Sequence, residues 1–83
     1  MNIQEFTNAA EALTDKGWKV EVENSEAYIQ APDSDSLTDE FKGAIRAAGG
    51  DVSEYINAVR IRFADLPDLD AETEANLYAA LQS

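Results

Sequence analysis

Two stretches of strict apolar–polar alternation constrain the fold of this chain more than any other feature. The first covers residues 18–31 and is interrupted only by Asn24 and Ser25. If these two residues form a two-residue turn, all apolar residues of the stretch lie on one side of a β-hairpin. The pairs expected from this turn are Val22 with Ala27, Val20 with Ile29 and Trp18 with Ala31. Because Trp18 is in phase with the valines, we predict that it belongs to the core.

The second alternating stretch covers residues 52–63 and predicts another hairpin. We place its turn at Asn57 and Ala58, although this register puts Glu54 on the apolar face. The pairs expected from this turn are Ile56 with Val59 and Val52 with Phe63.

Three segments with apolar residues at helical spacing flank the hairpins. We predict a helix from about 3 to 16 with Asn2 as its N-cap and Gly17 as its stop, a second between Pro32 and Gly49, and a third capped by Asp70 after a loop at 64–70. The expected buried stripes are Ile3, Phe6, Ala10 and Leu13; Leu37, Phe41, Ala44, Ile45 and Ala48; and Ala75, Leu77, Tyr78 and Leu81.

The resulting order is α-β-β-α-β-β-α in a single domain, residues 1–83. We predict an α+β fold, with one four-stranded antiparallel sheet that has helices on one face and leaves the other face open. The dipeptide Glu-Phe at 5 and at 40 begins two similar α-β-β units, which suggests an internal repeat.

The triplet Asp-Ser-Leu at 35–37 resembles the phosphopantetheine attachment site of acyl carrier proteins. The resemblance covers three residues, and carrier proteins are helical bundles, whereas alternating segments flank this helix on both sides. Ser36 can instead accept the N–H of Asp39 while the Asp39 carboxylate accepts the N–H of Ser36. We therefore interpret Ser36 as a helix N-cap.

The chain contains neither cysteine nor histidine. It therefore lacks a thiolate nucleophile, the usual imidazole base and the commonest metal ligands. Its acidic loops at 33–40 and 68–74 lack the ligand positions and central glycine of a calcium-binding loop. We expect no enzyme activity, no cofactor and no metal.

The first residues contain neither a basic segment nor an apolar run, and no stretch approaches the roughly 20 apolar residues of a membrane span. We expect a cytoplasmic protein.

The chain has 17 acidic and 6 basic side chains, which give a net charge of −11. It should repel nucleic acid and anionic membranes, and it should attract a basic protein surface. Helix-start acids complement the helix dipole, which explains part of the excess. Glu21 and Glu23 project from one side of a strand about 6.6 to 6.8 Å apart, close to the phosphate spacing of a nucleic-acid strand. The acids predicted to contact the partner are Glu21, Glu23, Glu26, Asp33, Asp35, Asp39 and Glu40.

A small basic and aromatic group is expected on the outward face of the second hairpin. It consists of Tyr55, Arg60 and Arg62, residue types that often anchor interfaces. The arginines could equally pair with Glu21 and Glu23 across the sheet. The sequence leaves both interpretations open.

In its small size, strong acidity, lack of His and Cys and compact α+β pattern, the chain resembles the inhibitors that phages direct against host defence. These are anti-CRISPR proteins and DNA mimics such as the uracil-DNA glycosylase inhibitor. The resemblance is one of overall type, without a shared motif. It implies a non-enzymatic inhibitor in the host cytoplasm that binds a basic protein or ribonucleoprotein surface, such as a CRISPR effector complex, as a monomer or homodimer. The alternative is a phage or bacterial structural or interaction module that pairs through its open sheet face, with acidity serving solubility only.

Overall fold

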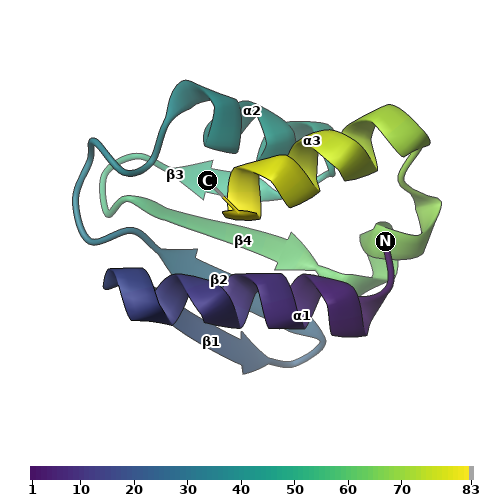
Figure 1. Ribbon diagram of the computed structural model, residues 1–83, viewed down its shortest axis with the longest axis horizontal. Coiled ribbons are helices and arrows are strands. Elements are labelled where there is room, and N and C mark those ends of the chain that lie inside the picture. The colour runs from purple at the N-terminus through teal and green to yellow at the C-terminus, as the bar shows by residue number, and fades with distance from the viewer. Residues whose placement is uncertain (83) are drawn as a thin grey trace.

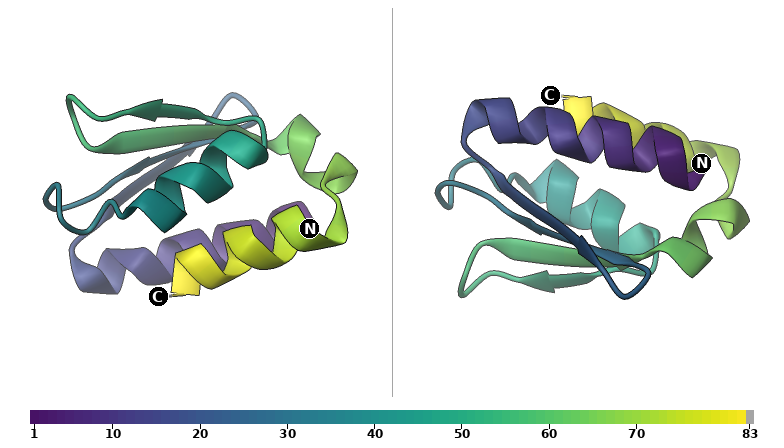
Figure 2. Two further views of the ribbon diagram at one scale, coloured as in Figure 1. Left: turned by 90° about the horizontal axis from the view of Figure 1, so that it is seen from above. Right: turned by 90° about the horizontal axis from the view of Figure 1, so that it is seen from below.

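The computed structural model describes residues 1–82 and confirms the predicted α+β class (Figure 1). Three α-helices lie on one face of a four-stranded antiparallel sheet, and the other face is uncovered (Figure 2). Along the chain the elements are α1 (Ile3–Ala12), the 3-10 helix η1 (Leu13–Lys16), β1 (Lys19–Glu23), β2 (Glu26–Gln30), α2 (Asp39–Ala47), β3 (Asp51–Ser53), β4 (Ala58–Arg62), the 3-10 helix η2 (Phe63–Asp68) and α3 (Ala71–Gln82).

The first hairpin has the predicted register. Val22 lies opposite Ala27, and Val20 lies opposite Ile29. The turn residues Asn24 and Ser25 have φ values of 53° and 62°. Two consecutive positive φ values characterise a type I′ turn, whose twist matches that of the flanking strands. The turn chemistry therefore sets this register locally.

The predicted register of the second hairpin is wrong. Val52 lies opposite Val59, and the turn comprises the four residues 54–57, the last of which has a φ of 55°. Burying an unpaired carboxylate is costly, and the observed register keeps Glu54 in the turn, outside the strand. There its Oε1 accepts a hydrogen bond from Nζ of Lys42 at 2.8 Å.

The strand order β1-β2-β4-β3 brings the second strands of the two hairpins together at the centre of the sheet. Ala27 pairs with Ile61, Ile29 pairs with Val59, and Tyr28 lies opposite Arg60 between them. Since the apolar members of these pairs all face the helices, one side of the sheet is apolar and the other is polar.

Most helix ends lie where the sequence predicts them. Oδ1 of Asn2 caps the start of α1, and Gly17, with a φ of 90°, ends η1. Gly49, with a φ of 85°, follows α2. Asp70 caps α3, since its Oδ1 accepts the N–H of Thr73 at 2.7 Å.

The predicted N-cap of the second helix is wrong. Thr38 caps α2, and its Oγ1 accepts the N–H of Phe41 at 3.1 Å. Ser36 lies in the preceding loop, where its N–H donates to Oδ1 of Asp33 at 2.8 Å. Leu37, the residue between Ser36 and Thr38, is buried in the core, and the helix begins after Thr38.

The segment predicted as a loop at 64–70 is largely helical, and the preceding strand ends earlier than expected. β4 stops at Arg62, and η2 follows and buries Leu66. The ring of Phe63 leaves the strand and packs edge-on against the ring of Phe6, with centroids 6.2 Å apart. This contact joins the end of the sheet to α1.

The helical core repeats itself 35 positions along the chain. The matching buried residues are Phe6 and Phe41, Ala9 and Ala44, Ala10 and Ile45, and Leu13 and Ala48. The repeat suggested by the two Glu-Phe dipeptides is therefore visible in the packing. The half-buried ring of Trp18 lies 5.1 Å from that of Phe41 and belongs to this cluster, as predicted.

The third helix has no counterpart in the repeat and packs against both α1 and α2. It buries only Leu77 and Leu81, one turn apart. Of the other residues predicted for the buried stripes, Ile3, Ala75 and Tyr78 are exposed. For α3 the reason is that a helix lying over two others is covered along a narrow strip.

The position of the cap leads to a direct test. Replacing Thr38 by Ala should destabilise the fold by about 1 kcal/mol, because the helix loses its side-chain acceptor. Ser36→Ala removes a hydroxyl that hydrogen-bonds Asp33 in an exposed loop but keeps the backbone N–H that Asp33 accepts, so it should have a smaller effect. Urea denaturation of both variants measures the two values, and a larger loss for Ser36→Ala would contradict the assignment.

Two glycines should respond in opposite directions to alanine. A Cβ on Gly50 would lie 2.6 Å from the carbonyl oxygen of Arg60 and 2.7 Å from Cγ2 of Ile45. Gly50→Ala should therefore cost about 1–3 kcal/mol, because both neighbours would have to move. Gly43 lies inside α2 with no atom near the position of a Cβ, so Gly43→Ala should stabilise the fold by about 0.5–1 kcal/mol. Thermal unfolding of the two variants compares these effects.

Candidate functional site: the uncovered face of the sheet

The uncovered face of the sheet is polar and is divided by charge. Successive side chains of a strand point to opposite faces, so each strand contributes every second residue to this face. The first hairpin contributes three glutamates and the central pair of strands contributes two arginines. In order across the sheet, the side chains on this face are Lys19, Glu21 and Glu23 from β1; Glu26, Tyr28 and Gln30 from β2; Ala58, Arg60 and Arg62 from β4; and Asp51 and Ser53 from β3.

An open cavity of about 310 Å³ lies on the acidic half of this face. Its lining comes from the first hairpin and from β4, and consists of Glu21, Glu23, Asn24, Glu26, Tyr28 and Arg60. Tyr28 is half-buried, lies between Glu21 and Arg60 in the paired strands and forms the centre of the site. Carboxylates beside an aromatic ring attract and orient a cationic group such as a Lys or Arg side chain.

The three glutamates of the cavity have no ion pair with any residue in 1–82. Other acids of the chain are engaged. Lys42 pairs with Asp39 and Glu54, Arg62 pairs with Asp65, and the N-terminal ammonium of Met1 pairs with Glu74. The carboxylates of the hairpin therefore lie close together without an ion pair inside the described part of the fold, and the nearest opposite charges on the paired strand are Arg60 and Arg62.

The acids whose pKa values are lowered have structural partners elsewhere. The hydrogen bond from Lys42 lowers the pKa of Glu54, and the same contact raises the pKa of Lys42. Hydrogen bonds from Ser36 lower the pKa of Asp33, and the backbone N–H of Thr73 lowers that of Asp70. These carboxylates hold a turn, a loop and a helix start in place.

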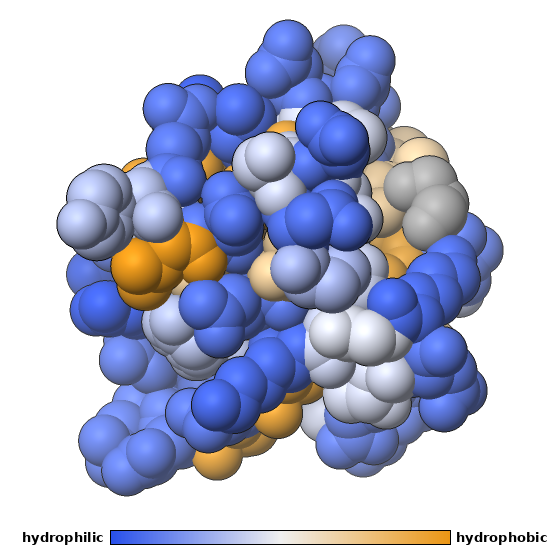
Figure 3. Space-filling model, turned by 90° about the vertical axis from the view of Figure 1, so that its left-hand side faces the viewer, coloured by the Kyte–Doolittle hydropathy of each residue, from blue (hydrophilic) through white to orange (hydrophobic). Residues whose placement is uncertain are grey.

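The predicted acidic contact residues form two separate groups. The hairpin group, Glu21, Glu23 and Glu26, lies near the β1–β2 turn, and the helix-start group, Asp33, Asp35, Asp39 and Glu40, lies beyond the other end of β2 (Figure 1). A five-residue strand spans roughly 13 Å, so the two groups do not share one cavity. The end of the molecule that carries the β2–α2 loop is largely hydrophilic, with small hydrophobic spots (Figure 3).

The predicted group of Tyr55, Arg60 and Arg62 does not form. Tyr55 is 97% exposed in the β3–β4 turn, whereas Arg62 lies at the opposite end of β4. The proposed pairing of the arginines with Glu21 and Glu23 is also absent, because β2 lies between β1 and β4. Nε of Arg62 lies instead 3.3 Å from Oδ2 of Asp65.

Tyr28 takes the place that the sequence analysis gave to Tyr55. The signal for it was present, since the alternation that puts Ala27 and Ile29 inside puts Tyr28 outside. The alternation does not predict which strand pairs with β2 on the side away from β1. The β2–β4 pairing places Arg60 directly opposite Tyr28.

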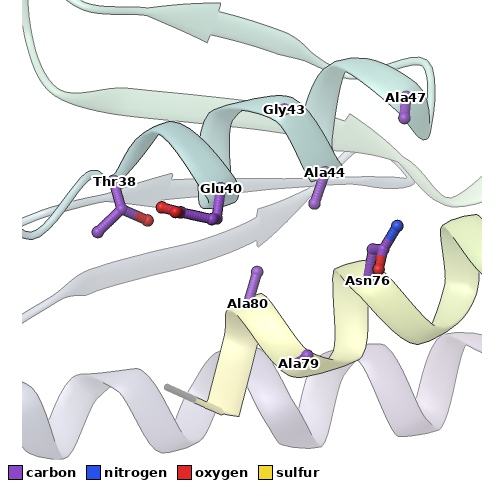
Figure 4. A pocket seen from close by; sticks show the side chains of 8 residues that line it. All are labelled: Thr38, Glu40, Gly43, Ala44, Ala47, Asn76, Ala79 and Ala80. Carbon is purple, nitrogen blue, oxygen red and sulfur yellow. The ribbon is translucent and has the colours of Figure 1, made fainter.

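A second hollow, of about 620 Å³, lies between α2 and α3 (Figure 4). Its walls are mainly small side chains, with three polar residues near the ends. The lining residues are the N-cap Thr38, then Glu40, Gly43, Ala44 and Ala47 from α2, and Asn76, Ala79 and Ala80 from α3. Among these lining residues, Glu40 is the one with an ionisable side chain.

Comparison with protein families, curated proteins and solved structures gave no match to this chain. Within residues 1–82, no three acidic side chains come together as a metal site. In the same part of the chain, no helix combines the length and apolar character needed to cross a membrane.

The pKa shift of Glu54 predicts a pH-dependent contribution to stability. Because its folded pKa lies below the ordinary value of 4.5, the Lys42 pair stabilises the fold above that pH and is lost as pH falls through the lowered pKa. Glu54→Gln should therefore be less stable than the wild type at pH 7, and the difference should disappear in acid. Urea denaturation across this range measures it.

Glu23→Gln is the matched control, since Glu23 has no ion pair with a described residue. Its stability should equal or slightly exceed that of the wild type at pH 7, because the substitution removes a like charge opposite Glu26. A loss as large as that of Glu54→Gln would show that the hairpin glutamates stabilise the fold.

Proposed function

We propose that this chain is a non-enzymatic inhibitor that binds a basic, nucleic-acid-binding protein surface through the acidic half of its open sheet face. One observation carries the proposal: Glu21, Glu23 and Glu26 line one cavity with Tyr28 on a face that no helix covers, and none of the three has an ion pair with a described residue. Grouped carboxylates repel one another, and a cationic partner removes that cost.

The spacing of the carboxylates suits a surface that normally binds phosphates. Glu21 and Glu23 point to the same side of β1, and such positions lie about 6.6 to 6.8 Å apart. Basic side chains placed to receive successive phosphates can reach carboxylates at this separation. The protein would then block the nucleic acid by occupying its site, both sterically and electrostatically.

The site is rigid, which favours binding. β2 has hydrogen-bonded strands on both sides, and the turn that joins it to β1 is short. A preorganised acidic surface loses little conformational entropy when it associates. Tyr28 adds an aromatic face for a partner Arg or Lys, and Arg60, which has no ion pair with a described residue, can donate to a carbonyl of the partner.

The overall likeness to anti-CRISPR proteins and DNA mimics makes a ribonucleoprotein of host defence, such as a CRISPR effector complex, our preferred partner. The helix-start group at the other end of β2 would then provide a second, weaker contact with the nucleic-acid-binding groove of that partner. In this function the chain acts in the cytoplasm of the host cell, as a monomer or homodimer.

The competing proposal is an interaction module whose acidity serves solubility only. In that case the position of the charges is irrelevant, and only their total matters. The charged, largely polar character of the open face favours the inhibitor, because proteins that associate face to face usually do so through apolar area.

Two triple variants separate the proposals. The site variant carries Glu21→Gln, Glu23→Gln and Glu26→Gln; the matched control carries Glu11→Gln, Asp15→Asn and Glu72→Gln at exposed positions elsewhere. Both reduce the net charge from −11 to −8. We expect the site variant to lose inhibition of target-DNA binding by a guide-loaded CRISPR nuclease at least about tenfold, and the control to lose much less.

Salt dependence and competition complete this test. Binding of the wild type should weaken several-fold between about 50 and 300 mM salt and should compete with the nucleic acid. Equal loss in both triple variants would favour the solubility interpretation. Simultaneous binding of the chain and the nucleic acid would contradict mimicry.

A further inference from the structure

We infer that β1 is an open sheet edge that binds an extended segment of the partner protein, in which basic and apolar residues alternate, as a fifth strand. This inference rests on the proposed function and names its binding mode. It concerns the backbone and Val22 of β1, which the electrostatic argument above does not use.

The two edges of the sheet are unequal. In the order β1-β2-β4-β3, the edge strands are β1 and β3. β3 has three residues, and the turn that follows it is tied to α2 by Glu54 and Lys42. β1 has five residues, all paired on one side with β2. It therefore offers the longer edge for another strand.

The outward backbone groups of β1 belong to its two valines. The two-residue turn closes on the pair Glu23 and Glu26, so the N–H and C=O groups of Glu21 and Glu23 point to β2. Those of Val20 and Val22 point away from it. The alternation continues across β2, where the N–H of Ala31 donates to Asn57 on the side away from β1, at 2.8 Å.

The helix layer does not cover the outer part of this edge. Val22 points to the same side of the sheet as Ala27, its partner on β2, yet Val22 is 48% exposed and Ala27 is 0% exposed. An apolar side chain on an added strand would cover Val22 and gain buried apolar area. The edge therefore lacks an apolar neighbour as well as a backbone partner.

The charges of β1 determine which strand fits. Glu21 and Glu23 point to the open face on either side of Val22 in the sequence, so a neighbouring strand needs Lys or Arg there and apolar residues on the other face. A second copy of this chain fits less well. Two chains of charge −11 repel, and a symmetric antiparallel pairing centred on Glu21 would oppose the two copies of Glu21 in addition to forming two Lys19–Glu23 pairs.

Strand addition supplies affinity and specificity that grouped carboxylates alone do not provide. Backbone hydrogen bonds give affinity that depends little on salt, and alternating side chains give a pattern that a globular basic surface lacks. The partner segment is therefore a protein strand, in contrast to a bound nucleic acid or membrane surface.

The first experiment uses the unaltered chain and two synthetic peptides of identical composition. In one peptide lysine and valine alternate, and in the other the valines are grouped together. The alternating peptide should bind at least about tenfold more tightly, since only it can match both faces of β1. Backbone hydrogen exchange should show new protection at the amides of Val20 and Val22. The amide of Glu21, which already points to β2, should change little.

A proline variant tests the same contact through the backbone. Val22→Pro removes an N–H that points away from β2, and edge strands tolerate proline at such positions. We expect the circular dichroism spectrum to be retained and the preference for the alternating peptide to be lost. Because exchange at Val20 is measured on the unaltered chain, the test does not depend on the folding of this variant.

The outcomes separate this inference from the proposed function. Equal binding of both peptides without new protection at Val20 and Val22 would overturn strand addition. The result expected in the CRISPR nuclease assay would not change. Selective binding of the alternating peptide together with undiminished inhibition by the site triple variant would overturn the acidic-surface proposal and leave strand addition intact. New protection confined to β3 would place the added strand at the other edge and contradict the inference.

Discussion

The antiparallel pairing of β2 with β4 is the contact on which the other features of this protein depend. It joins two hairpins that are separated by a helix in the sequence, and it sets Ala27 against Ile61 and Ile29 against Val59. A shift of one residue would carry Arg60 to the apolar face, because side chains alternate along a strand. The same pairing that closes the core therefore also brings Tyr28 and Arg60 together on the open face.

The repeat between the two halves of the chain is present in the helical core and absent from the open face. The first two helical segments bury matching residues 35 positions apart, so this part of the core repeats itself. The open face shows no such repeat. The first hairpin exposes glutamates on this face, whereas β4 of the second hairpin exposes Arg60 and Arg62. Because these side chains lie outside the core, their identity is independent of the packing that forms the sheet.

The arrangement also shows how a small chain can hold like charges together. Self-repulsion among exposed carboxylates destabilises a fold, and a domain of this size has a small margin of stability. Here Glu26 lies on β2, whose opposite face is buried in the core, and Glu21 and Glu23 lie on the edge strand β1 that pairs with it. The acids that have partners, such as Glu54 with Lys42, are used at turns and helix ends. The carboxylates exposed on the strands are thus different from those that stabilise turns and helix ends.

The sequence by itself determined the α+β class, the first hairpin and most helix ends, because each follows from near neighbours along the chain. The alternation on both sides of Asn24 and Ser25 specifies the register, and these two residues adopt the positive φ values that a two-residue turn requires. The turn at 54–57 has no comparably strong signal, and Ser36 and Thr38 are both able to cap a helix, so tertiary packing chose between the alternatives. The sequence identified the three glutamates of the candidate site, and tertiary structure decided which residues lie beside them. Whether Tyr28 or Tyr55 meets Arg60, and whether the two acidic groups adjoin, depends on which strands are neighbours, and that is set by burial between residues far apart in the sequence.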